Sequence, residues 1–445
     1  MLFAAVVAAL GGSSRPDAIQ TVALRPLAGL FLIPAIYWID REKLRDIRTP
    51  ILLLCALALW MALQLVPLPP ALWQLLPGRE PIAEIGAALG ASDVWRPISM
   101  VPARTLNALA SLVVPIAALL LVAATGASKR TLFLLIIAIG SINAAAGLLQ
   151  VISANSGPLY FYEVTNFGSP VGLFANHNHA AVLSSLTLVL IAYCATVPEF
   201  SFHGSLPRIG FGILYVMILF AALIGASRAG LLTAALALAT SLALLWLELR
   251  RSKRGRQKEL EKSSRVLSPA IILAIAVGAL AAMVALFALA GSIPAFERLT
   301  AGGTFEDLRW GLLPTLREMA WTYGLLGSGF GSWEEVYHIH EPDTLMFASY
   351  VNMAHNDWAQ LVIEGGLPAL ALVFALIAWV VRSIMVVVGG GEAGLGRLLL
   401  WLALGTIVLF ASLADYPLRA PLFQLVAVWL VAVFAFERAT YRGAT

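Results

Sequence analysis

The feature that most constrains this chain is a series of apolar runs, most of them long enough to cross a lipid bilayer. A transmembrane helix needs roughly 17 to 25 mainly apolar residues. Backbone N–H and C=O groups inside a membrane must bond to each other, so spanning segments of this length fold as helices. About twelve such runs are present, near residues 1–11, 23–39, 49–68, 106–125, 131–153, 179–197, 209–226, 229–248, 268–291, 359–381, 397–414 and 420–436.

The composition agrees with that reading. Only 12% of the residues are charged and 60% are hydrophobic, whereas soluble domains are roughly 25% charged. We therefore predict an all-α polytopic membrane protein of about twelve transmembrane helices. The run at residues 1–11 is read as a short first span and not as a cleavable signal peptide, because it lacks a basic beginning.

The lysines and arginines predict the orientation. Nineteen of the 29 fall on the segments that alternate to one side, and eight of these lie between Arg250 and Arg265. Excess positive charge stays in the cytoplasm, so both termini are predicted to be cytoplasmic. The same rule explains the sequence pI of about 9.1. The basic run at 250–258 is predicted to lie against anionic lipid; nucleic-acid binding is the weaker alternative.

Three long loops are predicted on the outer face, at residues 69–105, 154–178 and about 292–358. The last is far longer than an ordinary connection, which is typical of a functional segment with helices of its own. One such helix is predicted from Thr304, a good N-cap, to Tyr323, with Pro314 as a kink. The glycine-rich segment 324–331 should end it.

Three arginines are candidates for binding an anion. Arg228 lies between two spans, where Ser227 can cap the following helix, and a helix N-terminus and a guanidinium together favour a phosphate; the alternative is an arginine that reaches lipid headgroups. Arg309 and Arg317 are eight residues apart on the predicted loop helix and so lie close to one face. Either can hold a phosphate with two hydrogen bonds, or pair with the acidic residues of its own helix.

A polar triplet, His355, Asn356 and Asp357, precedes the apolar run at 359–381. Polar groups at a membrane boundary are costly unless they face water, a partner or a substrate. A histidine can take a proton near neutral pH, and we expect Asn356 or Asp357 to orient its ring. The alternative is that these residues only cap the next helix.

Further polar candidates are Asn176 and His179, at the start of the span at 179–197, and Arg419, in the turn before the last span. The first two can cap their helix and face the outer side. Arg419 can form a salt bridge with Asp415 or line the same site. No metal site is predicted, because His-x-His spacing is weak evidence and no cysteine or carboxylate falls at metal-ligand spacing.

An ordered set of motifs resembles the O-antigen ligase and polymerase superfamily of bacterial envelopes, most strongly from about residue 170 to 420. The motifs are Gly172-Leu-Phe-Ala-Asn-His-Asn-His-Ala180, Ser227-Arg-Ala-Gly230, Arg309 followed by Gly327-Ser-Gly-Phe-Gly331, Ala354-His-Asn-Asp-Trp358, Glu364-Gly-Gly-Leu-Pro368 and Asp415-Tyr-Pro-Leu-Arg419.

The resemblance implies a metal-independent, cofactor-free membrane glycosyltransferase of the C type. Such an enzyme moves a glycan from undecaprenyl diphosphate at the periplasmic face to an acceptor, which is lipid A-core for a ligase and another lipid-linked repeat unit for an O-antigen or exopolysaccharide polymerase. Arg228 and Arg309 would hold the diphosphate, and His355 would activate or position the acceptor hydroxyl. Attack from the opposite face would invert the anomeric configuration.

The resemblance also implies an organisation of the chain. N-terminal transmembrane helices occupy residues 1–168, the ligase-like core occupies 169–436 with the long periplasmic loop, and 437–445 form a cytoplasmic tail. A secondary transporter of about twelve spans is the alternative from another class. Against it, the sequence has no internal repeat and the centres of its spans are almost free of charge.

Overall fold

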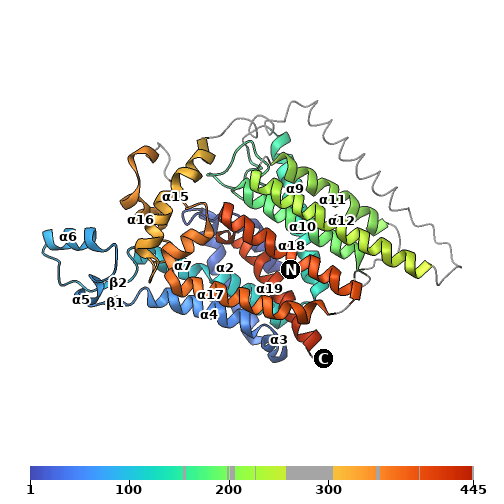
Figure 1. The fold of residues 1–445 in the computed structure, drawn as a ribbon, viewed down its shortest axis with the longest axis horizontal. Coiled ribbons are helices and arrows are strands. Elements are labelled where there is room, and N and C mark those ends of the chain that lie inside the picture. The colour runs from blue at the N-terminus through green and yellow to red at the C-terminus, as the bar shows by residue number, and fades with distance from the viewer. Residues whose placement is uncertain are drawn as a thin grey trace.

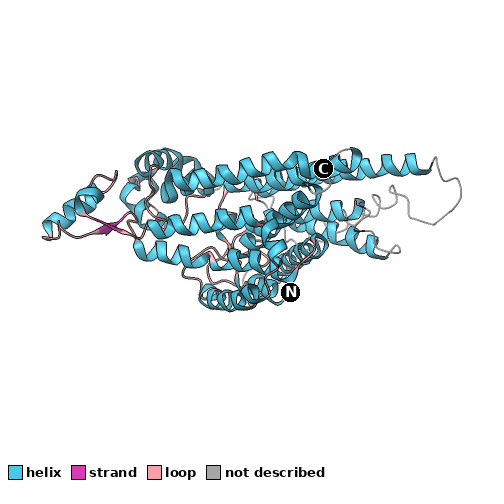
Figure 2. Cartoon of the chain, turned by 90° about the horizontal axis from the view of Figure 1, so that it is seen from below, coloured by secondary structure: helices cyan, strands magenta, loops and turns pink. Residues whose placement is uncertain are grey.

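The structure, a computed structural model, describes residues 1–153, 157–197, 200, 206–225, 227–256, 304–346, 351–389 and 391–442. It is almost entirely helical, and its long helices lie roughly side by side (Figure 2). The elements are α1 Leu2–Leu10, α2 Ile19–Tyr37, α3 Arg41–Asp46, α4 Arg48–Leu63, β1 Pro67–Leu68, α5 Pro70–Trp73, α6 Glu80–Ala88, β2 Arg96–Pro97, α7 Pro102–Ser111, α8 Val113–Thr125, α9 Lys129–Ile152, α10 His177–Thr196, α11 Leu206–Ile224, α12 Arg228–Arg256, α15 Thr304–Tyr323, α16 Trp333–His340, α17 Asp357–Val388, α18 Gly391–Ala414 and α19 Pro421–Arg442, with 3₁₀ turns at Asp343–Leu345 and Pro417–Arg419.

Eight helical segments within the described ranges are long and apolar enough to cross a membrane. Two shorter apolar helices, at Arg48–Leu63 and Ile209–Ile224, match two further predicted runs, and the run at 1–11 contains the nine-residue helix α1. The run predicted at 268–291 lies outside the described residues. The polytopic helical architecture is therefore confirmed, whereas the total of about twelve spans stays a prediction.

Helix α10 forms the centre of the bundle. Every residue from Asn178 to Ile191 is buried, as expected for a helix with neighbours on all sides; α9, α11, α12 and α18 contact it. Its hydroxyl side chains bond back to its own backbone, as Thr187 does to the carbonyl of Leu183 at 2.7 Å. The first turn of α10, from Asn178 onward, is therefore enclosed by neighbouring parts of the chain.

Helix α17 is broken near its beginning. Gly366 has φ 66° and ψ −167° within the helix, a conformation that favours glycine, and Pro368 follows it. The break therefore lies not at the proline but at Gly366. A side chain there would collide with the backbone, because a Cβ would lie 2.7 Å from the nitrogen of Gly327.

The glycine-rich segment 324–331 supplies the hydrogen bonds that this break removes from α17. The backbone nitrogens of Ser328 and Gly329 donate to the carbonyls of Ile363 and Glu364 at 2.8 and 3.0 Å. The nitrogen of Leu367 donates to the carbonyl of Gly324 at 2.8 Å. Unsatisfied backbone groups at this depth would cost several kcal/mol, so the segment that ends α15, as predicted, also completes α17.

The predicted outer loops gather at one end of the bundle. Helices α15 and α16 lie there beside a projecting arm formed by α5, α6, β1 and β2, while the basic end of α12 lies at the opposite end (Figure 1). The arm is fastened by Arg79, 2% exposed, which donates to the carbonyls of Ile98 at 2.6 Å and Gly327 at 3.1 Å. Burial lowers the pKa of Arg79 to about 10.

Candidate functional site

His355 contacts a buried carboxylate at the junction of α10, α17 and α18. Its Nδ1 lies 3.2 Å from Oδ1 of Asp415, whose side chain is 4% exposed. A carboxylate facing Nδ1 selects the tautomer with the proton on Nδ1, so Nε2 carries the free lone pair. Within the described part of the chain, Nε2 has no hydrogen-bond partner, and the His355 side chain remains 20% exposed.

Two asparagines of the α10 N-terminus hold Asp415 in place. The Nδ2 groups of Asn178 and Asn176 donate to its Oδ2 at 2.5 and 3.2 Å. Asn176 also caps α10, as predicted, because its Oδ1 accepts the backbone N–H of Asn178 at 2.8 Å. One carboxylate oxygen is thus used for positioning and the other faces the imidazole.

The expectation that Asn356 or Asp357 orients the His355 ring is wrong. The Oδ1 of Asn356 caps α17 by accepting the N–H of Ala359 at 3.0 Å, and the carboxylate of Asp357 faces Arg419. Both side chains are engaged on the helix that follows His355. The carboxylate that does contact the ring comes from a residue 60 positions away in the sequence.

The backbone of His355 is unusual. Its φ is 50°, and among the described non-glycine residues it alone has a positive φ. Such conformations cost energy and persist where the surroundings enforce them, often at functional sites. The flanking residues supply that enforcement: the N–H of Ala354 donates to Gln360 at 3.1 Å, and the N–H of Asp357 donates to the carbonyl of Asp415 at 3.3 Å.

Tyr416 separates two histidine rings beside this carboxylate. Its ring centroid lies 5.0 Å from that of His355 and 5.2 Å from that of His179. His179 was expected to face the outer side, but it is 1% exposed because it lies between Tyr416 and Phe174. Neither of its ring nitrogens has a hydrogen-bond partner among the described residues. His179 therefore packs beneath the site and does not line it.

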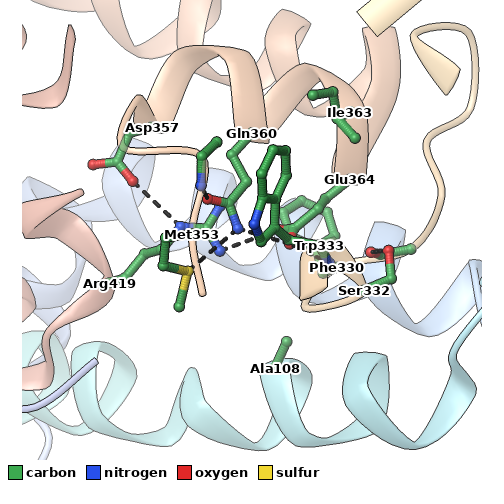
Figure 3. A network of polar contacts seen from close by, with 12 residues as sticks. Ala108, Phe330, Ser332, Trp333, Met353, Asp357, Gln360, Ile363, Glu364 and Arg419 are labelled. Carbon is green, nitrogen blue, oxygen red and sulfur yellow. Dashed lines mark hydrogen bonds and ion pairs between the residues drawn. The ribbon is translucent and has the colours of Figure 1, made fainter. Parts of the chain in front are cut away.

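A second polar network lies along the first turns of α17 (Figure 3). Arg419 reaches between two carboxylates, with its Nε 3.4 Å from Asp357 and its Nη1 3.1 Å from Glu364. Glu364 is fully buried, and it also accepts the side-chain amide of Gln360 at 3.0 Å and the N–H of Trp333 at 3.2 Å. The possible Asp415–Arg419 salt bridge is therefore wrong: the two residues belong to neighbouring networks.

The guanidinium of Arg419 is shielded from water, which lowers its pKa, but the charges of Glu364 and Asp357 outweigh this effect and raise it. Arg419 therefore stays charged and joins the turn before α19 to α17. The sequence singles out Glu364 only as part of the Glu364-Gly-Gly-Leu-Pro368 motif; the structure makes it the centre of this network.

The arginines predicted to bind an anion lie on two elements. Arg228 is the first residue of α12 and is exposed, and Ser227 caps that helix as predicted, accepting the N–H of Gly230 at 2.9 Å. Arg317 is exposed on α15. Arg309 also belongs to α15, but its side chain lies outside the described part of the structure, so the predicted common face of Arg309 and Arg317 stays a prediction.

Asp415 and Asn178 are the site residues that sequence reasoning undervalued. Asp415 was noted only as a partner for Arg419, and Asn178 only as part of the Asn-His-Asn-His motif. Each stands at the outer end of a predicted span, and polar residues at such ends of different helices can meet. The sequence does not say which ends are neighbours.

The arrangement can accept a proton and orient a hydroxyl. A histidine fixed by a buried carboxylate, with Nε2 toward solvent, is suited to general-base catalysis. His355 precedes α17, Asp415 follows α18, and the two asparagines that hold Asp415 lie at the start of α10. The geometry is therefore set by the packing of these three helices.

Comparison with known proteins supports the resemblance. No curated protein matches the chain. Residues 213–374 match the family model described as O-antigen ligase, a range that includes Ser227, Arg228, Arg309, His355 and Glu364. Over this range the chain is therefore similar to the O-antigen ligase family.

Proposed function

We propose that the protein is a membrane glycosyltransferase that moves a glycan from undecaprenyl diphosphate to an acceptor sugar at the periplasmic face of the bacterial inner membrane. The observation that carries this proposal is the His355–Asp415 contact, which leaves Nε2 of His355 as a proton acceptor. The family match supplies the reaction class. The exposed Arg228 supplies a cation for an anionic leaving group.

In the proposed reaction Asp415 holds the Nδ1 proton and Nε2 of His355 takes the proton of the acceptor hydroxyl. The freed oxygen forms a bond to the anomeric carbon while the bond from that carbon to the diphosphate oxygen breaks. Attack and departure on opposite faces invert the anomeric configuration. The leaving diphosphate gains negative charge, which Arg228 and Arg309 neutralise.

Asn176, Asn356, Asp357, Arg317 and Arg419 were the other predicted substrate-binding residues. Of these, Arg317 is exposed and able to contact a glycan directly. Asn176, Asn356, Asp357 and Arg419 are engaged in caps and ion pairs. We assign these four the role of fixing the position of His355 and the outer end of α17, and His179, which is buried, a packing role beneath them.

Lipid A-core is the proposed acceptor, which makes the protein a ligase. A polymerase that extends a lipid-linked repeat unit is the second candidate, because the motifs of the chain resemble a superfamily that contains both kinds of enzyme. Purified protein incubated with undecaprenyl-diphosphate-linked glycan separates the two. Transfer to added lipid A-core identifies a ligase, and lengthening of the glycan without it identifies a polymerase.

The site assignment is tested with Arg228→Ala and His355→Ala. Both variants should insert, purify as monodisperse protein and transfer no detectable glycan. His338→Ala is the matched control, because His338 is an exposed histidine of α16 whose contact is a surface pair with Glu341. Near-normal transfer by both site variants would overturn the assignment, and solute flux without glycan transfer would favour the transporter.

A further inference from the structure

A large cavity adjoins the site on the side away from α12. It has a volume of about 780 Å³, within the range of small-molecule sites. Its walls come from α2, α4, α7, α17, α18 and α19, with residues 13–17 and the start of α16 at its outer end; none of the lining residues among those described belongs to α10 or α12. Arg228 starts α12, so the cavity and Arg228 lie on different helices around the His355–Asp415 contact.

The cavity is polar at one end and apolar along its length. Its outer end reaches Asp357, two residues after His355, and is bounded by Arg419, Glu364 and Trp333. Below this end only apolar or small side chains of α17, α18 and α19 line it, except for Gln424, Ser412, Thr406 and the indoles of Trp379 and Trp401. Along α19 the lining runs from Pro421 to Phe434, which is about 20 Å at 1.5 Å per residue.

The apolar part is open to the membrane-facing surface. Leu402 and Leu409 of α18 line it, yet they are 54% and 42% exposed. A hydrocarbon chain can therefore enter from the side without leaving the bilayer.

One cation at the polar end has no carboxylate partner among the residues that the structure describes. The lining arginines Arg15, Arg104 and Arg419 each pair with carboxylates. Arg25, half-buried in α2, donates to the amide oxygen of Asn107 on α7, and no carboxylate contacts it in the described part of the chain. An arginine within a membrane helix is costly unless a partner balances it. A phosphate is the partner that a guanidinium fits best.

Across the cavity, Ala108 of α7 faces the network formed by Arg419, Glu364 and Trp333 (Figure 3). Asn107, which contacts Arg25, and Ala108 belong to the same α7 wall of the cavity. Because the Ala108 side chain is small, this wall leaves space in front of Arg419, Glu364 and Trp333. A headgroup at Arg25 would lie in this space, with its glycan toward the outer end.

We infer that this cavity holds the lipid anchor of the acceptor, with an acceptor phosphate on Arg25 and the hydrocarbon chain along α17, α18 and α19. This inference rests on the proposed function and adds the location of the second substrate. The donor diphosphate then lies on the Arg228 side, and His355 stands between the two. Such an arrangement brings the nucleophile and the leaving group to opposite faces of the sugar, as inversion requires.

Lipid binding tests this assignment without turnover. Detergent-purified protein is titrated with lipid A-core alone and with undecaprenyl diphosphate alone, and bound copies are counted by native mass spectrometry. If the acceptor carries acyl chains, the protein binds one copy of lipid A-core. Arg25→Gln then lowers the affinity for this copy roughly tenfold, because one charge-assisted hydrogen bond is lost. A prenyl acceptor appears as two undecaprenyl diphosphates, one of which Arg25→Gln weakens. In both cases Arg228→Ala weakens the undecaprenyl diphosphate that occupies the donor site.

A second variant fills the cavity without touching the charge. A Cβ on Gly405 meets nothing within 4 Å, and Gly405 lines the wall, so Gly405→Phe should fold and exclude the same lipid copy. Gly29→Phe is the matched control: Gly29 has equally open space on α2 and lies outside the wall.

Arg25→Lys should restore part of the affinity, and dephosphorylated lipid A-core should bind Arg25→Gln and the wild type equally.

Two results would overturn the assignment. One is a single undecaprenyl diphosphate copy that Arg25→Gln weakens and Arg228→Ala does not, which would make this the donor cavity. The other is unchanged binding of both lipids in Arg25→Gln and Gly405→Phe. Absence of glycan transfer by the wild type, with these binding shifts present, would instead refute the proposed function and leave the lipid site standing.

Discussion

The two polar networks at the outer end of α17 are built from the same kinds of side chain but differ in what they leave available. In the Arg419 network, Glu364 is fully buried and both of its oxygens accept hydrogen bonds. In the His355 network the carboxylate is also enclosed, but the imidazole it holds is 20% exposed and its Nε2 has no hydrogen-bond partner among the described residues. The first network uses its hydrogen bonds to join helices, and the second keeps one position for a substrate.

This difference distinguishes a structural residue, Glu364, from a proposed catalytic residue, His355, which the sequence motifs do not do. Glu364 and His355 both belong to motifs of the family resemblance, so membership of a motif gives both the same weight. The two residues differ in burial and in whether they have a polar atom left to bind a substrate. Variants in the two networks should accordingly fail in different ways.

The largest effect is expected from removing the His355 imidazole, whose Nε2 is the proposed proton acceptor. His355→Gln should lower the rate of glycan transfer about 100- to 10,000-fold, the usual contribution of a general base, while the unfolding temperature changes little. Initial rates and thermal unfolding of the same preparation check this. A small change in rate would remove His355 from the chemistry.

Breaking the enclosed network should affect the fold more than the rate. Glu364→Gln leaves Arg419 with one carboxylate, and removing one partner of a buried ion pair costs about 3 kcal/mol. We expect a lower unfolding temperature and a lower yield, with the folded fraction keeping most of its activity per molecule. A rate loss as large as that of His355→Gln, at unchanged stability, would erase the distinction between the networks.

Asp415→Asn tests the link between the two helices that meet at His355. An amide can still bond to Asn176 and Asn178 but no longer favours the Nδ1–H tautomer or stabilises the imidazolium. Transfer should fall about a hundredfold with KM for the donor unchanged. Asn178→Asp, which places a second carboxylate beside Asp415, should also slow transfer; an Asp415→Asn enzyme with normal kcat would show that the carboxylate only packs.

The smallest effect is expected at the break in α17. The indole N–H of Trp60 donates to the carbonyl of Gly365 at 2.7 Å, and Trp60→Phe removes that bond while keeping most of the ring. The loss should be about 1 kcal/mol of stability, measured by thermal unfolding, with no change in transfer. Leu59→Phe, at an exposed neighbouring position, serves as the control.

The sequence predicts some of these features residue by residue. Gly324, the first residue of the glycine-rich segment, ends α15 at Tyr323 as expected, because that signal is local; the cap expected at Thr304 stays a prediction. Ser227 and Asn176 cap the helices that they were expected to cap for the same reason. The all-helical membrane architecture follows from the apolar runs alone.

The pairings across the site could not be predicted in this way. His355 meets Asp415, Arg419 meets Glu364, and His179 lies under Tyr416 only because α10, α17 and α18 pack at one end. Which helix ends become neighbours depends on the packing of the whole bundle, and no periodicity encodes it. The break in α17 is another such case: Pro368 is the stronger local signal, but the helix breaks at Gly366, where the close approach of Gly327 requires a glycine.

The broken helix has a consequence for the order in which the protein assembles. The carbonyls at the break are bonded by residues near position 60 and near position 328, and His355 is held by Asp415, close to the C-terminus of the chain. A nascent chain that ends before Asp415 lacks at least one of these partners. The site therefore forms only once the chain has been inserted as far as Asp415, and a chain that stops earlier has most of the sequence motifs but no working centre.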